Sequence, residues 1–415
     1  MKLQETGKTW YRLTTTAIIP RKSVALEVIC MILVLSTYWF HWGSIEEFAK
    51  AIDDKPPVLF EDFIYHYYPT GEGFFAGRGP VPGYLYSAFF ASLLAILALF
   101  PIAEAVVVWG GLQVAMTIWF YVVSAYRLLE LGAGNRLLYL LVLLTSLPLI
   151  HNFKWGQVSI LITLGVALAF IYQHGGRSAI AGLVLAAVTC IKYYPGVLLL
   201  YFIIRRDLRF IMAFGMGMVG FYVLLPAMWL GVDGWLHFTA ESFSEFPTAR
   251  LFYGSPGSQY VVHVILRWTH NLGYVMTEEV YDGLRWASMV FFVLHVGLAE
   301  WFRRQDVKRA SVLAVATLLL ALPLVVPSSW PHYFVYLPLC QMAVALSVSD
   351  RAIRRWTRCL LWLPLAVSIV SSNIFIFIEF PNPTLYYNVG LLFFSDMLSL
   401  IVLYSLGILI LRKRI

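Results

Sequence analysis

Apolar stretches of about 20 residues recur along this chain from Ser23 to Leu411, and they limit its possible folds more than any other feature. Each is long enough to cross the ~30 Å hydrocarbon core of a bilayer as a helix. The chain is 13% charged, against roughly 25% in soluble domains. Because the stretches are apolar all round, a soluble bundle is excluded. The sequence predicts an all-α fold, a polytopic transmembrane helical bundle.

The basic residues set the predicted orientation, because they cluster between apolar stretches in the positive-inside pattern. With these clusters inside, about twelve spans are predicted, at 24–42, 84–101, 105–126, 137–150, 156–173, 179–203, 208–230, 284–301, 310–326, 332–348, 359–378 and 387–411. Residues 1–415 are expected to form a single multi-pass domain in the inner or plasma membrane. The net charge of +7 follows this pattern and gives no indication of nucleic acid binding.

Two sizeable segments, 43–83 and 231–283, are then expected outside, with interfacial helices rich in aromatic residues and carboxylates. The cytoplasmic turns are short and hold no phosphate-binding loop, so ATP is not expected as an energy source. The four cysteines have no zinc-type spacing. No metal and no cofactor is predicted, and any chemistry is expected on the outer face.

The first outer segment contains "LFEDFIYHYYP" at 59–69. In an α-helix Asp62 and Tyr65 would share a face, whereas Glu61 would point elsewhere. Burial among aromatic rings raises the pKa of a carboxyl group and makes it a better general base. A solvated loop acid beside interfacial tyrosines is the alternative interpretation. Arg78, further along the segment, is a candidate for binding an anion.

Four motifs in order resemble the GT-C superfamily of membrane glycosyltransferases. They are most similar to the polyprenol-phosphate-mannose-dependent alpha-mannosyltransferases of glycosyltransferase family 87. The motifs are the acidic residue before Phe and Tyr in the first outer segment, Gly156-Gln157, Lys-x-x-Pro at 192–195, and Ser-x-Trp-x-His at 328–332. The likeness runs from about residue 60 to 345. The family's usual Tyr-Pro-Pro before the second span is replaced by the residues at 79–84, a departure that concerns the sugar more than the reaction.

The resemblance implies an inverting enzyme that moves a sugar, in this family mannose, from a polyprenyl-phosphate donor to a hydroxyl of a lipid or glycan acceptor. Asp62 would be the general base.

A lysine inside a span costs about 2.5–3.5 kcal/mol on insertion scales and usually faces a cavity or a partner. A phosphate near the membrane surface would be such a partner for Lys192. The expected substrate-binding residues are Lys192, His332, Arg78, Tyr65, Gln157, Trp330, Arg250 and Arg267; the expected partners are the donor, the acceptor and membrane lipids.

Other interpretations stay open. Lys192 could be a structural lysine bonded to carbonyl groups, and His332 an interfacial packing residue. The span count puts Gln157 near the inner face, so either the count slips within 137–203 or Gln157 is structural. A flippase explains twelve crossings equally well, although the second half holds no copy of "GQVS…IKYYP". An outer-leaflet glycan polymerase or ligase typically has its largest outer segment late, and here that segment is mid-chain.

Overall fold

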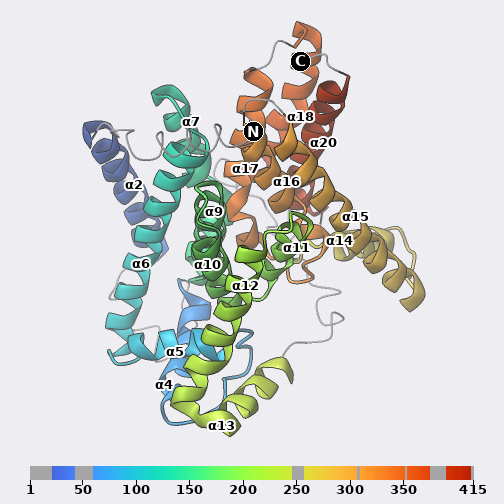
Figure 1. Ribbon diagram of the computed structural model, residues 1–415. Coiled ribbons are helices and arrows are strands. Elements are labelled where there is room, and N and C mark those ends of the chain that lie inside the picture. The colour runs from blue at the N-terminus through green and yellow to red at the C-terminus, as the bar shows by residue number, and fades with distance from the viewer. Residues whose placement is uncertain are drawn as a thin grey trace. The chain divides into compact units, whose positions relative to one another are not determined.

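The computed structural model describes residues 21–42, 59–244, 257–305, 309–350, 353–373 and 389–412. These residues form helices and turns, with no strand among them, so the all-α prediction is confirmed for this part of the chain. The chain divides into two compact units (Figure 1). The first unit comprises 1–131 with 152–246, and the second comprises 132–151 with 247–415.

Several helices have the length and composition of membrane spans. Among the described residues, four helical stretches pass this test, at 102–128, 208–244, 331–349 and 391–411. A fifth is α7 (Ala133–Leu144) together with α8 (Leu147–Trp155), if this pair, bent by 49°, counts as one span. The chain is therefore a multi-pass membrane protein by its helices, and the count of twelve spans stays a prediction.

The first unit is built from short and long helices whose bounds differ from the predicted spans. In chain order these helices are α2 (Arg21–Trp42), α4 (Tyr68–Phe74), α5 (Ala88–Leu97), α6 (Ile102–Val123), α9 (Ser159–His174), α10 (Ser178–Ile191), α11 (Leu199–Ile204), α12 (Leu208–Gly217) and α13 (Leu225–Ser244). Figure 1 shows α4, α5 and α13 gathered at one end of this unit.

The predicted span 84–101 is wrong, because its helix α5 has ten residues. At 1.5 Å per residue such a helix covers about 15 Å, half of the hydrocarbon core. Ser87 caps its start by accepting a hydrogen bond from the Phe90 N–H at 3.3 Å. Near its other end, the backbone of Leu94 lies against Gly71 in α4. Helix α5 therefore packs along the first outer segment instead of leaving it.

The predicted span 179–203 is also wrong, because it contains a reversal. Helix α10 ends at Ile191, and Lys192 is extended, with φ −141° and ψ 125°. A 3-10 helix at 194–198 and α11 then lead back, because the Ser178 hydroxyl at the start of α10 donates to Asp207 at 2.8 Å. Helix α12 next runs parallel to α10, with which it packs closely (Figure 1).

These packings give the first unit two distinct ends. At one end, the Trp109 indole near the start of α6 donates to the Gly156 carbonyl at 2.9 Å, just before α9 begins. Helices α9 and α10 are antiparallel neighbours, so Lys192 returns to the end that holds Gly156. The opposite end contains Asp207 and four arginines, which are Arg177, Arg205, Arg206 and Arg209. These four arginines thus lie away from Gly156 and Lys192.

A bend in the stretch 208–244 brings the chain onto the first outer segment. Gly231 has φ 71° and ψ 168°, which interrupts the helix directly after the predicted span 208–230. Beyond the bend, the Phe238 ring lies 6.1 Å from the rings of Phe74 and Tyr84, measured between centroids. The second part of α13 therefore lies beside α4 and the loop that follows it.

The second unit is a bundle of apolar helices. Besides α7, its helices are α14 (Val261–Asn271), α15 (Glu278–Arg304), α16 (Ala310–Leu320), α17 (Leu337–Ser349), α18 (Arg355–Asn373) and α20 (Leu391–Leu411). Sequence neighbours from α15 to α18 pack on one another, and α20 packs on α18. The Arg309 guanidinium binds Asp350 at 3.0 Å, which joins the start of α16 to the end of α17.

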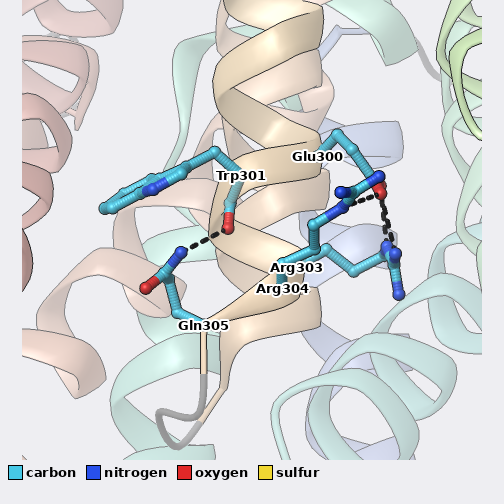
Figure 2. Close-up of polar contacts among 5 residues, drawn as sticks. All are labelled: Glu300, Trp301, Arg303, Arg304 and Gln305. Carbon is cyan, nitrogen blue, oxygen red and sulfur yellow. Dashed lines mark hydrogen bonds and ion pairs between the residues drawn. The ribbon is translucent and has the colours of Figure 1, made fainter.

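Two arginines of one predicted basic cluster lie in the last turn of α15. Figure 2 shows the end of α15, where the buried Glu300 carboxylate accepts hydrogen bonds from Arg303 and Arg304, each at 2.7 Å. Gln305 donates to the Trp301 carbonyl at 3.0 Å and closes the helix end. A single carboxylate that holds two arginines leaves this helix end with a net positive charge.

Candidate functional site

A hydrogen-bonded network in the first unit joins Asp62 to Lys192 through Gln157. The Gln157 amide N–H donates to Asp62 Oδ2. Its carbonyl oxygen Oε1 accepts from the Tyr86 hydroxyl at 2.9 Å and from Lys192 Nζ at 3.4 Å. The Tyr67 hydroxyl donates to that of Tyr86 at 2.5 Å. Three residues predicted from sequence therefore meet in one network, together with two tyrosines.

The backbone around Gln157 is fixed from several sides. Gly156 has φ +65°, and a Cβ there would lie 3.2 Å from Phe60, so glycine suits both the conformation and the space. The Gln113 amide donates to the Gln157 carbonyl at 2.6 Å, and the Asn152 amide donates to Gln113 at 2.8 Å. These bonds hold the Gln157 side chain where it faces Asp62.

A π-helical turn at Phe63–Tyr67 decides which tyrosine joins Asp62. The Tyr68 N–H bonds to the Phe63 carbonyl, an i→i+5 bond. This wider turn brings the residue five positions after Asp62 toward the network, so Tyr67 is buried in it. Tyr65, predicted from α-helical spacing to share the Asp62 face, is 44% exposed and lies outside the network. That prediction is wrong in its geometry, and substrate binding by Tyr65 stays a prediction.

The Asp62 carboxyl group has the electrostatics expected of a general base. Burial raises its pKa to about 6, while the positive charges of His66 and Lys192 and the hydrogen bond from Gln157 lower it. A carboxyl group with this pKa is deprotonated at neutral pH and more basic than an exposed aspartate. His66 is itself held in place, because its Nδ1 lies 3.0 Å from the Pro82 carbonyl and must donate to it.

Lys192 is 8% exposed and packs into the aromatic part of the network. Its Nζ donates to the Tyr86 hydroxyl at 3.1 Å and lies 4.8 Å from the centroid of that ring. The neighbouring Tyr193 ring stacks on Phe243 of α13 at 5.6 Å. The lysine therefore reaches its partners from the reversal after α10, where the helix has ended and the backbone is extended.

Arg78 and Arg250 are not brought into this network. The Arg78 side chain is exposed and lies over Gly73, where a Cβ would be 3.2 Å from its Nε. Arg250 lies outside the described residues. The predicted anion-binding roles of both residues stay predictions.

A second polar cluster forms within the second unit, around the predicted turn 327–333. Ser258 donates to the Pro327 carbonyl at 3.0 Å, and the Gln259 N–H donates to the Ser329 carbonyl at 2.7 Å. A Cβ on Gly257 would lie 2.1 Å from the Trp330 ring, so this glycine allows the tryptophan to pack on the backbone. The stretch 257–260 and the turn that carries Trp330 thus form one structure.

His332 and Arg267 lie in this second cluster's elements, and both are nearly buried. His332, at 5% exposure, follows the turn in a 3-10 helix, Pro331–Tyr336, and its Nδ1 is 3.2 Å from Nδ1 of His151. Arg267 is 7% exposed in α14, where burial lowers its pKa to about 10. Its neighbour His263, whose pKa burial lowers to about 4, bonds to Ser258 at 2.8 Å.

Sequence reasoning missed Tyr67, Tyr86 and His151. Tyr67 was within the quoted motif but was not singled out, because α-helical spacing selects Tyr65 and a π turn leaves no sequence signature. Tyr86 was part of a loop expected to enter a span, and His151 had no neighbouring motif. Only their contacts identify them.

Helices of membrane length around a partly buried carboxylate and a buried lysine define a multi-pass membrane protein with a buried polar network. The model of one family, described as glycosyltransferase family 87, matches residues 84–327. The chain belongs to this family and is a glycosyltransferase. The match includes Tyr86, Gln157 and Lys192, whereas Asp62 and His332 lie just outside it. No curated protein and no solved structure matches the chain.

Proposed function

We propose that this glycosyltransferase moves mannose from a polyprenyl-phosphate donor to a hydroxyl of a lipid or glycan acceptor, with inversion, on the outer face of the membrane. The observation that supports this most is the bridge from Asp62 through Gln157 to Lys192. Because Gln157 lies between them, Asp62 and Lys192 are close together but do not bond directly, so the lysine does not protonate the carboxylate. Sugar transfer from a phosphate needs both groups at once.

The base acts on the acceptor. Gln157 holds Asp62 by Oδ2, and the other carboxylate oxygen takes the proton from the acceptor hydroxyl. The acceptor oxygen then bonds to the anomeric carbon from the face opposite the phosphate, and the bond from that carbon to the phosphate oxygen breaks. The electron pair of this bond leaves with polyprenyl phosphate. General base assistance of this kind contributes typically ~10²–10⁴-fold.

The cation acts on the leaving group. Negative charge grows on the phosphate as the glycosidic bond breaks, and a fixed positive charge stabilises it most in a site with little water. Lys192 lies at the chain reversal beside an aromatic wall formed with Tyr193 and Phe243, which suits a phosphate attached to an apolar chain. Arg78, His332 and Arg267 are proposed as further phosphate ligands, and Tyr65 and Trp330 as sugar contacts.

The corrected helix bounds support the proposal that the Asp62 network lies on the outer side of the membrane. We infer that Gln157 and Lys192 lie on the outer side, because the chain turns back after α10 and both residues then lie at the end of the first unit opposite Arg177 and Arg205. Arg177 and Arg205 then fall on the inner side, as the positive-inside pattern requires. This arrangement removes the conflict that the sequence left at Gln157, because Gln157 and Asp62 must share one side of the membrane to bond.

The donor is tested with purified protein and a panel of short-chain polyprenyl phosphates carrying mannose, glucose, galactose or arabinose. We expect transfer from the mannose donor and none from GDP-mannose, since the site would bind a lipid-linked phosphate. Transfer from a nucleotide sugar alone would refute the donor class, and transfer of another sugar would correct the sugar only.

The location is tested by cysteine labelling, after the exposed Cys30 and Cys359 have been replaced by serine. Ala76→Cys and Ala179→Cys are matched changes at exposed alanines at opposite ends of the first unit. A membrane-impermeant maleimide added to intact cells should label position 76 and reach position 179 only after the cells are opened. The reverse pattern would place the Asp62 network in the cytoplasm.

A further inference from the structure

His151 is a residue without a role in the proposal above, yet it makes a specific contact. It lies in α8, within the second unit, and its ring faces His332 with centroids 5.3 Å apart and planes 27° apart. The two Nδ1 atoms are 3.2 Å apart, which is a hydrogen-bonding distance between ring nitrogens. Two histidines from segments 181 positions apart therefore form a pair.

Counting protons shows what this pair can hold. A hydrogen bond between two Nδ1 atoms needs a proton on one of them and a lone pair on the other. The pair can therefore be neutral or carry one positive charge, but two imidazolium rings would break the bond. A neutral imidazole has one N–H. If its Nδ1 accepts the hydrogen bond of the pair, its Nε2 carries the proton and can donate; if its Nδ1 donates, its Nε2 can only accept.

We propose that His151 is a positioning residue that orients His332 and allows the tautomer of His332 that binds the donor phosphate. When His151 donates from Nδ1, the proton of neutral His332 must be on Nε2, where it can donate to a phosphate oxygen. When the pair is charged and His332 is the imidazolium, Nε2 again carries a proton. The remaining neutral arrangement puts a lone pair at His332 Nε2, which a phosphate would disfavour. The inference rests on the proposed function, in which His332 binds that phosphate.

The experiment compares His151→Leu with His151→Asn, because an asparagine amide can take the place of Nδ1 and leucine cannot. We measure the affinity of the purified full chain for a short-chain polyprenyl phosphate, and then KM for the donor and kcat. We expect leucine to weaken binding and raise donor KM by about tenfold or more, the loss typical of a hydrogen bond to a charged group. Asparagine should restore most of the affinity, and kcat should change less than KM.

A double variant separates positioning from general damage. If His151 acts through His332, adding His151→Leu to His332→Ala should change donor affinity little further, since coupled residues are not additive. Equal losses in both backgrounds, or unchanged affinity in His151→Leu alone, would overturn the proposal. So would an asparagine variant that melts like wild type but binds as weakly as the leucine variant.

The wild-type measurement distinguishes this inference from the function beneath it. Wild-type protein that does not bind polyprenyl phosphate would refute the proposed donor and the role of His151 together. If wild-type protein binds polyprenyl phosphate and His151→Leu binds it with the same affinity, the role of His151 alone is overturned and the donor proposal stands.

Discussion

Two buried glutamines, one in each unit, show how differently the same side chain can be used. Gln157 follows Gly156, where the helix is interrupted, and bridges Asp62 and Lys192. Gln341 lies inside the continuous helix α17 and donates to the hydroxyls of Ser368 and Ser372 at 2.9 and 3.1 Å. The hydroxyl groups around Gln341, from Ser368, Ser372, Ser395 and Ser399, are called the serine cluster below.

The difference lies in charge and in backbone. Each member of the serine cluster is neutral and satisfied by neighbouring helices, which is how polar residues join helices inside a membrane. Asp62 and Lys192 are ionisable groups in partly or fully buried positions, which are costly and therefore rarely kept without a function. Their network also lies where regular helix stops, at a π turn, a left-handed glycine and an extended lysine. Irregular backbone and charge together support the proposal that the Asp62 network is the reaction site, whereas the serine cluster is a packing site.

The largest expected effect comes from removing the base. Asp62→Asn keeps the size of the side chain and its contact with Gln157 but cannot take a proton at neutral pH. Transfer should fall by ~10²–10⁴-fold, while binding of polyprenyl phosphate and the melting temperature stay close to wild type. The matched control is Glu61→Gln, the adjacent acid. An Asp62→Asn protein with normal turnover would eliminate Asp62 and make Glu61 the next candidate.

Removing the cation should act mainly on the donor. Lys192→Met keeps the length of the side chain and loses the charge, so affinity for polyprenyl phosphate should fall by about tenfold or more. Lys192→Arg retains the positive charge with a different geometry and should keep part of the affinity for polyprenyl phosphate. Binding is measured first, in the absence of acceptor. Unchanged affinity in Lys192→Met would show that this lysine is structural.

How far the sequence predicted this site depends on the kind of feature. The membrane class, Asp62, Gln157 and Lys192 were within reach, because apolar length and costly intramembrane charges are visible in the chain. Tyr67 was not, because α-helical spacing places Tyr65 beside Asp62, whereas a π turn brings Tyr67 into the network. Two predicted spans were wrong where apolar length alone misled, at α5 and at the reversal after α10. Such features depend on tertiary contacts, which one sequence does not display.

Breaking the bridge should change the pH dependence of transfer. The pKa of Asp62 is raised to about 6 by burial, so the free enzyme should lose activity about tenfold per pH unit below 6, as the base becomes protonated. The Gln157 hydrogen bond lowers this pKa. Gln157→Leu should therefore move the acid limb of kcat/KM to higher pH and reduce the rate at neutral pH. If the acid limb of the kcat/KM profile of Gln157→Leu lies at the same pH as in wild type, Gln157 does not influence the ionisation of Asp62.

The smallest expected effect is at the other glutamine. Gln341→Leu removes hydrogen bonds that in membranes average ~0.6 kcal/mol and reach ~1.7 kcal/mol, so the melting temperature should fall slightly. The Gln341 carbonyl oxygen is buried and makes no hydrogen bond within the described part of the chain, which reduces the loss further. Transfer should stay within about twofold of wild type, because the serine cluster holds helices together and contains no charged group.

The control for a local change in α18 is Ser371→Ala. The Ser371 hydroxyl bonds back to the Ser368 carbonyl at 3.1 Å. Loss of transfer in Gln341→Leu at unchanged melting temperature would mean that a neutral cluster in continuous helix can also serve the reaction, and the distinction drawn between the two glutamines would fail.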